Sequence, residues 1–149
     1  MFADAFRDTG AVLLPGERHP ERPLDATATF AVVATFTTPY TPAPVPLETA
    51  ETPAARHRGL LGRDGVEGAL LLPGARSVHT LGMRFAIDVA YLDREFRVLA
   101  VRTMRPGRIG RPRLRARSVL EAEAGALEGW GVRVGVRVTV VAGDEGSEG

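Results

Sequence analysis

The sequence predicts a mainly β protein, an antiparallel β-sandwich or a partly open barrel with one short helix. Short apolar segments recur along the chain, and turn-forming glycine, proline and aspartate residues separate them. Only the segment at about 53–61 has a clear helix-opening sequence. Strands do not alternate with long helices, so a doubly wound nucleotide-binding fold is not expected.

The composition predicts one folded domain with flanking segments. A chain of 149 residues is long enough for one hydrophobic core. Residues 1–44 place prolines among charges, and we expect a partly disordered N-terminal extension with one possible strand at 27–37. Residues 45–142 are expected to form a single β domain. Residues 143–149 are acidic and glycine-rich and are expected to be a disordered tail.

The first elements of the β domain are predicted from proline and glycine. Residues 45–49 are expected to form an edge strand, because a proline within a strand removes one ladder hydrogen bond. Thr52 can cap a helix and Pro53 suits its first position. The helix is expected to cover about 53–61 and to end at Gly62.

The remaining elements follow from apolar runs and alternation. Strands are predicted at 69–72, 85–92, 96–104 and 118–123, with a turn at 93–95 that makes an antiparallel hairpin. Residues 126–130 are expected to be a helical turn or loop. Valines alternate with polar residues and glycine over 132–141, which predicts a half-buried closing strand.

Several classes of function are excluded or disfavoured by composition. Because the chain has no cysteine, disulfides, thiolate zinc sites and cysteine nucleophiles are excluded. All 19 basic residues are arginine, and lysine, asparagine and glutamine are absent, which we interpret as the codon usage of a GC-rich bacterium. No apolar run approaches the ~20 residues of a membrane span, and no secretory signal is recognisable. We therefore expect a cytoplasmic protein, a monomer or weak dimer, with no cofactor and no membrane partner.

The segment from His79 to Asp93 is the most informative part of the chain. Asp88 lies among small apolar residues on a predicted strand, where a carboxylate needs a cation or hydrogen-bond donors. Arg84 is four residues away, roughly 13 Å along a strand, which is too far for a close pair. We therefore expect a bidentate pair from Arg56 or Arg63 on the helix, which would dock the helix on the sheet. The functional alternative makes Asp88 a general base or a ligand-binding acceptor.

His79 precedes this strand and has three possible roles. It can act as an acid or base, bond to neighbouring backbone, or join His57 and Asp88 in a two-histidine, one-carboxylate metal triad. No spacing signature supports the triad, so no metal site is predicted. No serine lies in a G-x-S-x-G setting, so a hydrolase nucleophile of that type is not indicated.

The segment from Arg102 to Arg117 carries seven arginines and no acid. Such a segment can contact phosphates, so nucleic-acid or other anion binding is one hypothesis. It lacks interleaved aromatic residues for base stacking. A solvated loop, partly paired with nearby acids, is the simpler interpretation.

Three blocks of the sequence resemble the bacterial and archaeal family called domain of unknown function 192. Residues 56–64 are similar to its R-x-x-GLM-x-R block, Ile87-Asp88 within 83–93 to its Leu/Ile-Asp block, and 118–125 to its V-L-E-x-x-x-G block. The resemblance covers about 47–142 and implies a compact, mostly β domain with no assigned activity. Where many members carry W-M-K-N-T, this chain has residues 79–83. The resemblance implies these shared site residues: Arg56, Gly59, Arg63, Asp88, Glu121 and Gly125.

We carry forward three hypotheses of function. The first is a non-enzymatic domain that binds a small polar or anionic ligand, or a partner protein, with Arg56, Arg63, His79, Asp88 and Glu121 as ligand-binding residues. The second is a hydrolase or lyase with Asp88 or Glu121 as acid or base and Arg63 as anion clamp. The third is an accessory component that is recruited through its proline-rich arm.

Overall fold

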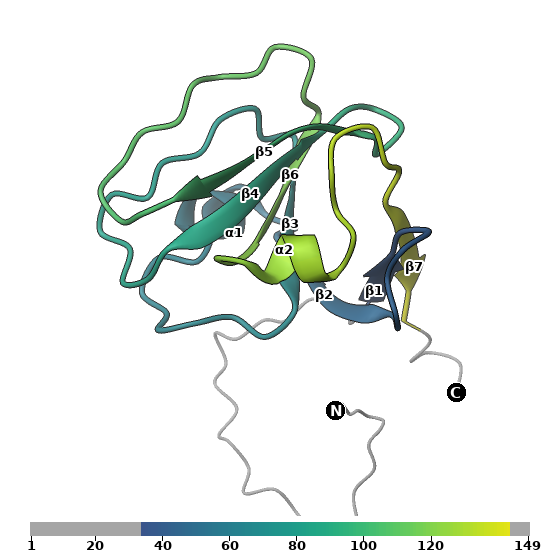
Figure 1. Cartoon of the computed structure of the whole chain (residues 1–149). Helices are drawn as coiled ribbons and strands as arrows, with labels where there is room; N and C mark the ends of the chain where they lie inside the picture. The colour runs from purple at the N-terminus through teal and green to yellow at the C-terminus, as the bar shows by residue number, and fades with distance from the viewer. Residues whose placement is uncertain (1–33, 144–149) are drawn as a thin grey trace, which may run out of the picture. The chain divides into compact units, whose positions relative to one another are not determined.

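The computed structural model describes residues 34–143, which form one open, mixed β-sheet of seven strands with two short helices (Figure 1). The prediction of a mainly β fold is confirmed. The strand order is β5-β4-β6-β3-β2-β1-β7, and all neighbours are antiparallel except β2 and β3. The elements are β1 (Ala34–Thr37), β2 (Val45–Thr49), α1 (Pro53–Arg58), β3 (Ala69–Pro73), β4 (Ile87–Leu92), β5 (Val98–Met104), β6 (Ser118–Glu123), α2 (Ala126–Gly129) and β7 (Thr139–Ala142).

Both faces of the central strands are covered. Every residue of β4 is buried, and so is every residue of β6 except Glu123. Figure 1 shows α2 in front of the sheet and α1 behind it. Leu127 of α2 packs into one apolar cluster with Ala90 and Leu92, and Leu60, which follows α1, packs into a second cluster with Val89 and Tyr91. Successive residues of β4 thus alternate between two cores.

The predicted β4–β5 hairpin is confirmed, and its turn is held by one aspartate. The Asp93 carboxylate accepts hydrogen bonds from the backbone N–H groups of Glu95 (2.8 Å) and Arg97 (2.9 Å). These bonds lower the pKa of Asp93. Phe96 takes a positive φ of 64° in this turn, and its ring packs against the first core cluster.

The expectation that residues 45–49 form an edge strand is wrong. Strand β2 lies inside the sheet, antiparallel to β1 and parallel to β3. Alternate backbone groups of a strand point to opposite neighbours, so Pro46 removes only one of the bonds that β2 can make. The backbone of β2 at Pro46 passes close to Gly68, just before β3. Only glycine fits there, because a Cβ on residue 68 would lie 2.3 Å from the Pro46 carbonyl oxygen.

Strand β1 pairs with both β2 and β7. Residues 34–37, which we assigned to the N-terminal extension, therefore contribute a strand to the sheet. Their strand conformation agrees with the C-terminal part of the strand predicted at 27–37. Residues 27–33 of that prediction, the remainder of the extension up to residue 33, and residues 144–149 of the expected tail lie outside the described residues.

Helix α1 begins as predicted and ends earlier. The Thr52 hydroxyl accepts a hydrogen bond from the Ala55 N–H (3.0 Å), and Pro53 occupies the first turn. The helix ends at Gly59, not Gly62, because Gly59 has a positive φ of 50° that leaves the helical region. The predicted helical turn at 126–130 is confirmed by α2.

The closing strand is shorter than the predicted 132–141. Only β7 is a strand, because Gly135 turns the chain with φ of 92° and leaves Val134 64% exposed. The turn meets the other edge of the sheet. The Val98 N–H donates to the Val136 carbonyl, and the Gly135 N–H donates to the Val98 carbonyl, both at 2.9 Å. These bonds draw the two edges together without closing the sheet.

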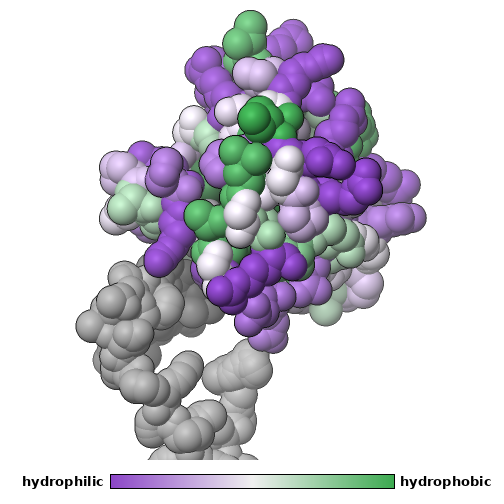
Figure 2. Space-filling model, turned by 90° about the vertical axis from the view of Figure 1, so that its left-hand side faces the viewer, coloured by the Kyte–Doolittle hydropathy of each residue, from purple (hydrophilic) through white to green (hydrophobic). Residues whose placement is uncertain are grey.

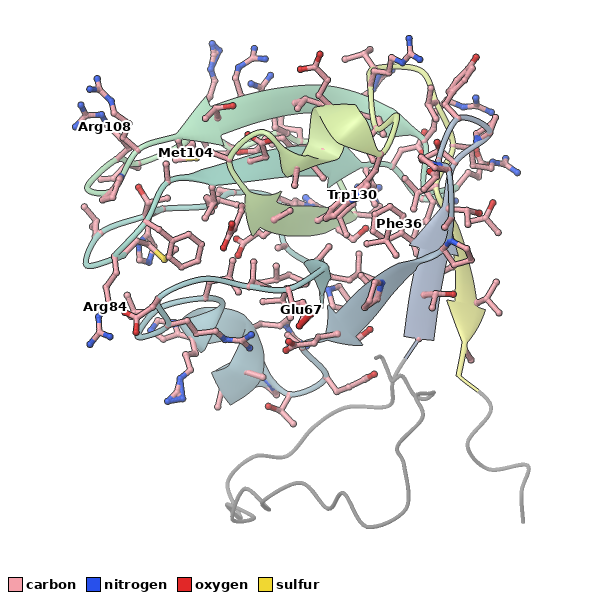
Figure 3. All side chains as sticks on the ribbon, turned by 60° about the horizontal axis from the view of Figure 1, so that its bottom comes forward. Phe36, Glu67, Arg84, Met104, Arg108 and Trp130 are labelled. Atoms are coloured by element: carbon pink, nitrogen blue, oxygen red, sulfur yellow. The ribbon has the colours of Figure 1, made fainter. Side chains whose placement is uncertain are left out.

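Aromatic packing and one buried hydroxyl secure the parts outside the sheet. Trp130, at the end of α2, meets the ring of Phe36 of β1 edge to face at 5.7 Å between centroids, and Figure 3 shows the two side chains pointing toward each other. Thr80 is fully buried. Its hydroxyl donates to the Arg105 carbonyl (2.7 Å) and accepts from the Arg108 N–H (2.9 Å), so it ties the loop before β4 to the loop after β5.

We predict that Thr80→Val lowers the free energy of unfolding by about 1–3 kcal/mol, because it removes both hydrogen bonds of a buried hydroxyl while keeping the side-chain shape. Urea denaturation measures the loss. Thr139→Val, at an exposed site on β7, is the matched control and should change stability by less than about 0.5 kcal/mol. Equal effects of the two substitutions would contradict this role of Thr80.

Candidate functional site

Asp88 is held by backbone and a hydroxyl, not by arginine. Its Oδ1 accepts a hydrogen bond from the Thr103 hydroxyl (2.6 Å), and its Oδ2 accepts from the backbone N–H groups of Gly125 (2.8 Å) and Leu127 (3.3 Å). The predicted pair with Arg56 or Arg63 is wrong. Thr103 is the cross-strand partner of Asp88 on β5. The Gly125 N–H comes from the turn between β6 and α2, and the Leu127 N–H comes from α2 itself.

These bonds give Asp88 a structural task. Gly125 has φ of 92° at the start of α2, and its N–H points at the carboxylate. Hydrogen bonds from several donors offset the cost of burying a carboxylate. Asp88 therefore fixes the position of α2 on the sheet. Asp88 does have partners, as expected of a buried aspartate, but they lie on the α2 face of the sheet and not on the face that α1 covers.

Glu121 lies on the opposite face of the sheet from Asp88. Its register partner on β4 is Val89, whereas the partner of Asp88 on β6 is Ala122. Glu121 is only 5% exposed, and a Cβ built on Gly59 would lie 3.5 Å from its Oε1. Among residues 34–143, none donates a hydrogen bond to its carboxylate. Burial raises the pKa of Glu121 to about 7, and the positive charge of Arg63 opposes this shift.

Arg63 pairs with Glu48 and not with Asp88 or Glu121. Its two terminal nitrogens donate to the two carboxylate oxygens of Glu48 on β2, at 3.0 and 2.9 Å. This bidentate pair raises the pKa of Arg63, and the charge of Glu121 adds to the effect. Arg63 therefore has two acidic neighbours. Glu48 is half-exposed and hydrogen-bonded to it, whereas Glu121 is buried and accepts no hydrogen bond from residues 34–143.

The other two predicted site residues lie elsewhere. Arg56 is half-buried on α1, and within the described part of the chain it forms no ion pair. His79 is exposed; its Nδ1 accepts the Leu81 N–H at 3.2 Å, and its backbone bridges to Ile109. His79 thus bonds to neighbouring backbone, one of the roles we considered. Over residues 34–143 no three His, Asp or Glu side chains gather as they would around a metal ion.

A cleft of about 510 Å³ opens beside Asp88. Three polar residues that sequence reasoning missed line it: Thr103, Glu128 and Arg133. The guanidinium of Arg133 stacks on the ring of Tyr40 at 4.4 Å. Thr103 could have been found by pairing the hairpin strands across their turn, but Glu128 and Arg133 reach the cleft only through the tertiary fold. The other lining residues are Val101, Gly125, Val132 and Val134.

A second cleft of about 300 Å³ lies at the hairpin turn. It is lined largely by charged side chains, including Asp93, Arg94 and Arg117. No helix among the described residues is long and apolar enough to cross a bilayer.

Comparison with known proteins identifies the family. The family model of domain of unknown function 192, described as an uncharacterised ACR, matches residues 34–140. The chain belongs to this family. A UPF0127 protein of Pyrococcus horikoshii is 44% identical over 52 residues, which are 35% of this chain and 45% of that relative. The aligned region therefore spans less than half of that relative's length.

Two solved structures share the fold. A protein from Sinorhizobium meliloti, described as a proposed transcription regulator, aligns with a TM-score of 0.62 and 18% identity over 74% of this chain and 95% of its own. A protein of unknown function from Novosphingobium aromaticivorans aligns with a TM-score of 0.58 and 19% identity over 74% of this chain and 92% of its own. At these identities the likeness concerns the fold alone.

The site residues that we expected from the family resemblance divide between the two faces of the sheet. Asp88 and Gly125 are bonded to each other on the α2 face. Gly59, Arg63 and Glu121 come together behind the sheet, where α1 ends. The first set is fully hydrogen-bonded and accounts for local structure, whereas the second contains a buried carboxylate without a hydrogen-bond donor from residues 34–143.

We predict that Asp88→Asn lowers the free energy of unfolding by about 2–3 kcal/mol, because an amide cannot accept both backbone N–H groups with a charged oxygen. Chemical denaturation measures the change. Asp64→Asn is the control: Asp64 is exposed and pairs with exposed Arg84 at 2.9 Å, so its loss should have little effect. A fully stable Asp88→Asn protein would contradict the structural role.

We predict that Glu121→Gln removes a pH dependence of stability. The folded-state pKa of about 7 lies above the ordinary value of 4.5, so the folded protein holds this proton longer than the unfolded chain. Stability contributed by the protonated carboxyl is therefore full below about pH 4.5 and is lost as pH rises to about 7. At pH 8 the variant should be more stable than the wild type by up to about 3 kcal/mol, with little difference at pH 4.

Urea midpoints measured from pH 4 to pH 8 check this expectation. Glu67→Gln, at an exposed site, is the control and should leave the pH profile of the wild type unchanged. If the Glu121→Gln and wild-type profiles run parallel over this range, Glu121 does not titrate as the geometry implies.

Proposed function

We propose that this domain binds a small polar ligand in the cleft beside Asp88. The observation that carries the proposal is the cleft itself. Its volume of about 510 Å³ is in the range of small-molecule sites, and both polar side chains and valines line it. Asp88 is fixed by three hydrogen bonds, which supports a preorganised site because the carboxylate needs no rearrangement to meet a ligand.

The polar groups of the cleft favour a ligand that donates hydrogen bonds. Asp88 and Glu128 supply two carboxylates, and Arg133 supplies the single cation. Each carboxylate oxygen has more than one acceptor site, so Asp88 Oδ1 can accept from a ligand in addition to Thr103. The expected ligand is therefore a small amine or polyol with an apolar part facing the valines. The anionic ligand that Arg63 was expected to clamp is not favoured here, because Arg63 does not line this cleft.

For the enzymatic alternative, Glu121 is the better candidate for the acid–base group. Asp88 is occupied by donors, whereas Glu121 has a pKa of about 7, which suits proton transfer near neutral pH. Arg63 lies close enough for its positive charge to lower the pKa of Glu121. However, Glu121 is 5% exposed beneath Gly59, so a substrate would reach it only if the end of α1 moved. The cleft beside Asp88 requires no such movement, and we place ligand binding first.

The anion-binding alternative concerns the arginine segment. Arg102 lies in β5, and the guanidinium of Arg113 stacks on the buried Tyr91 ring at 5.1 Å, so two of its arginines take part in the fold. The name of the Sinorhizobium meliloti neighbour agrees with a nucleic-acid partner, but that protein shares only the fold. A binding domain for a small ligand remains the better-supported function.

A ligand panel tests the proposal. Amines, polyols, amino acids and organic acids are screened by thermal shift, since a ligand that binds only the folded state raises the melting temperature. Hits are then titrated by calorimetry against Glu128→Gln and Arg133→Gln. We expect an amine or polyol to bind, and Glu128→Gln to weaken an amine by about tenfold through loss of one charged contact.

Glu67→Gln is the matched control, because it makes the same change at an exposed site outside the cleft. Equal affinities for the wild type and for both cleft variants would place the ligand elsewhere. A panel in which only dianions bind, with no effect of Glu128→Gln, would also contradict the proposal.

A further inference from the structure

Three exposed aliphatic side chains gather on the loops at one edge of the sheet. Leu81 is 46% exposed and Ile109 is 75% exposed, although apolar side chains of this size are normally covered. His79 links the two, because its backbone bridges to Ile109 and its Nδ1 accepts the Leu81 N–H. Leu61, 36% exposed, belongs to the same group, because a Cβ on Gly82 would lie 3.2 Å from its Cδ1. Figure 2 shows a band of green and white residues down this face.

Arginines flank this aliphatic group. Arg105, Arg108 and Arg111 are exposed, and none forms an ion pair with another residue of the described range 34–143. Arg84 lies at the same end of the molecule, as Figure 3 shows with Arg108, and it pairs with Asp64. Purple residues stand on both sides of the apolar band in Figure 2. We call these three arginines, with Leu61, Leu81 and Ile109, the basic loop surface.

The loops that carry this surface are fixed to each other. The Thr80 N–H donates to the Arg108 carbonyl and the Gly107 N–H to the Thr80 carbonyl, both at 2.8 Å. The Gly110 N–H donates to the Val78 carbonyl at 2.8 Å. Together with the buried Thr80 hydroxyl, these bonds hold the aliphatic tips and the arginines in one arrangement. A partner therefore meets a preformed surface and orders little chain on binding.

We propose that the basic loop surface binds the anionic headgroups of a lipid bilayer, with Leu81 and Ile109 entering the interface between headgroups and acyl chains. Arginines near an anionic leaflet attract it, and exposed aliphatic side chains gain by leaving water. Both kinds of side chain on this surface then find a partner. The contact is peripheral and needs no spanning helix. The expectation that there is no membrane partner rested on the lack of a spanning run and of a recognisable secretory signal, and a peripheral contact needs neither.

A nucleic acid fits the surface less well. Phosphates would satisfy the arginines, but Leu81 and Ile109 would stay in water. Residues 78–84 and 105–111 contain no Phe, Tyr or Trp on which an unpaired base could stack. None of the six residues of this surface lines either of the two clefts described above.

Vesicle co-sedimentation of the full chain tests the proposal. The vesicles are pure phosphatidylcholine or phosphatidylcholine with phosphatidylglycerol, each at low and high salt. We expect binding to the anionic vesicles, weakened by salt. Arg108→Gln with Arg111→Gln should weaken binding by roughly fivefold per arginine. Ile109→Ser should weaken it several-fold while leaving the salt dependence unchanged.

Matched variants separate local contact from overall charge. Arg94→Gln with Arg137→Gln makes the same charge change elsewhere, and Val141→Ser changes an aliphatic residue that is 54% exposed on β7. These controls should bind like the wild type. The proposal is overturned if the full chain ignores anionic vesicles, if the controls lose as much binding as the test variants, or if the test variants weaken duplex DNA binding and not vesicle binding.

Discussion

Burial of both faces of β4 and β6 is the constraint on which the rest of this structure depends. In a strand that is covered on both sides, a polar side chain meets no water on either face, so the fold must supply its partners. Asp88 and Glu121 sit on these two strands and point to opposite faces. Asp88 accepts three hydrogen bonds, whereas Glu121 accepts none from residues 34–143.

The contrast between these two acids separates structure from candidate chemistry. Asp88 joins β4 to β5 and to the start of α2, so a change there disturbs three elements. Glu121 stays buried under Gly59 with its pKa raised to about 7, a condition that stability alone does not favour. The site residues that we expected from the family resemblance contain both kinds of group. They do not form one site, because the sheet separates Asp88 from Glu121.

The proposed binding regions follow from the same architecture. The cleft beside Asp88 is lined by β4, by β5 and by the segment 125–134, which holds α2 and the turn before β7, so its walls come from three separate parts of the chain. The basic loop surface is formed by the connections that precede β4 and follow β5, which the buried Thr80 hydroxyl joins, and by Leu61 in the connection after α1. Each region thus depends on contacts between segments that are distant in sequence.

The sequence by itself determined the local features of this protein. Alternation predicted which residues of β4 share a face, the cap at Thr52 and Pro53 predicted where α1 begins, and apolar runs predicted β3, β5 and β6. These features depend on neighbours within a few residues, which a sequence displays. The alternating valines at 132–141 predicted too long a strand, because Gly135 turns the chain and hydrophobic alternation does not reveal such a turn.

Only the tertiary structure decided the partners. We had expected an arginine to pair with Asp88, but Asp88 is bound by the Thr103 hydroxyl and by the N–H groups of Gly125 and Leu127. Arg63 pairs with Glu48 instead. Strand β2 became an interior strand despite its proline because β1 and β3 both pair with it. The physical reason is the same in each case: a charge or an unpaired strand edge shows that a partner is needed, whereas register and crossover decide which distant group reaches it.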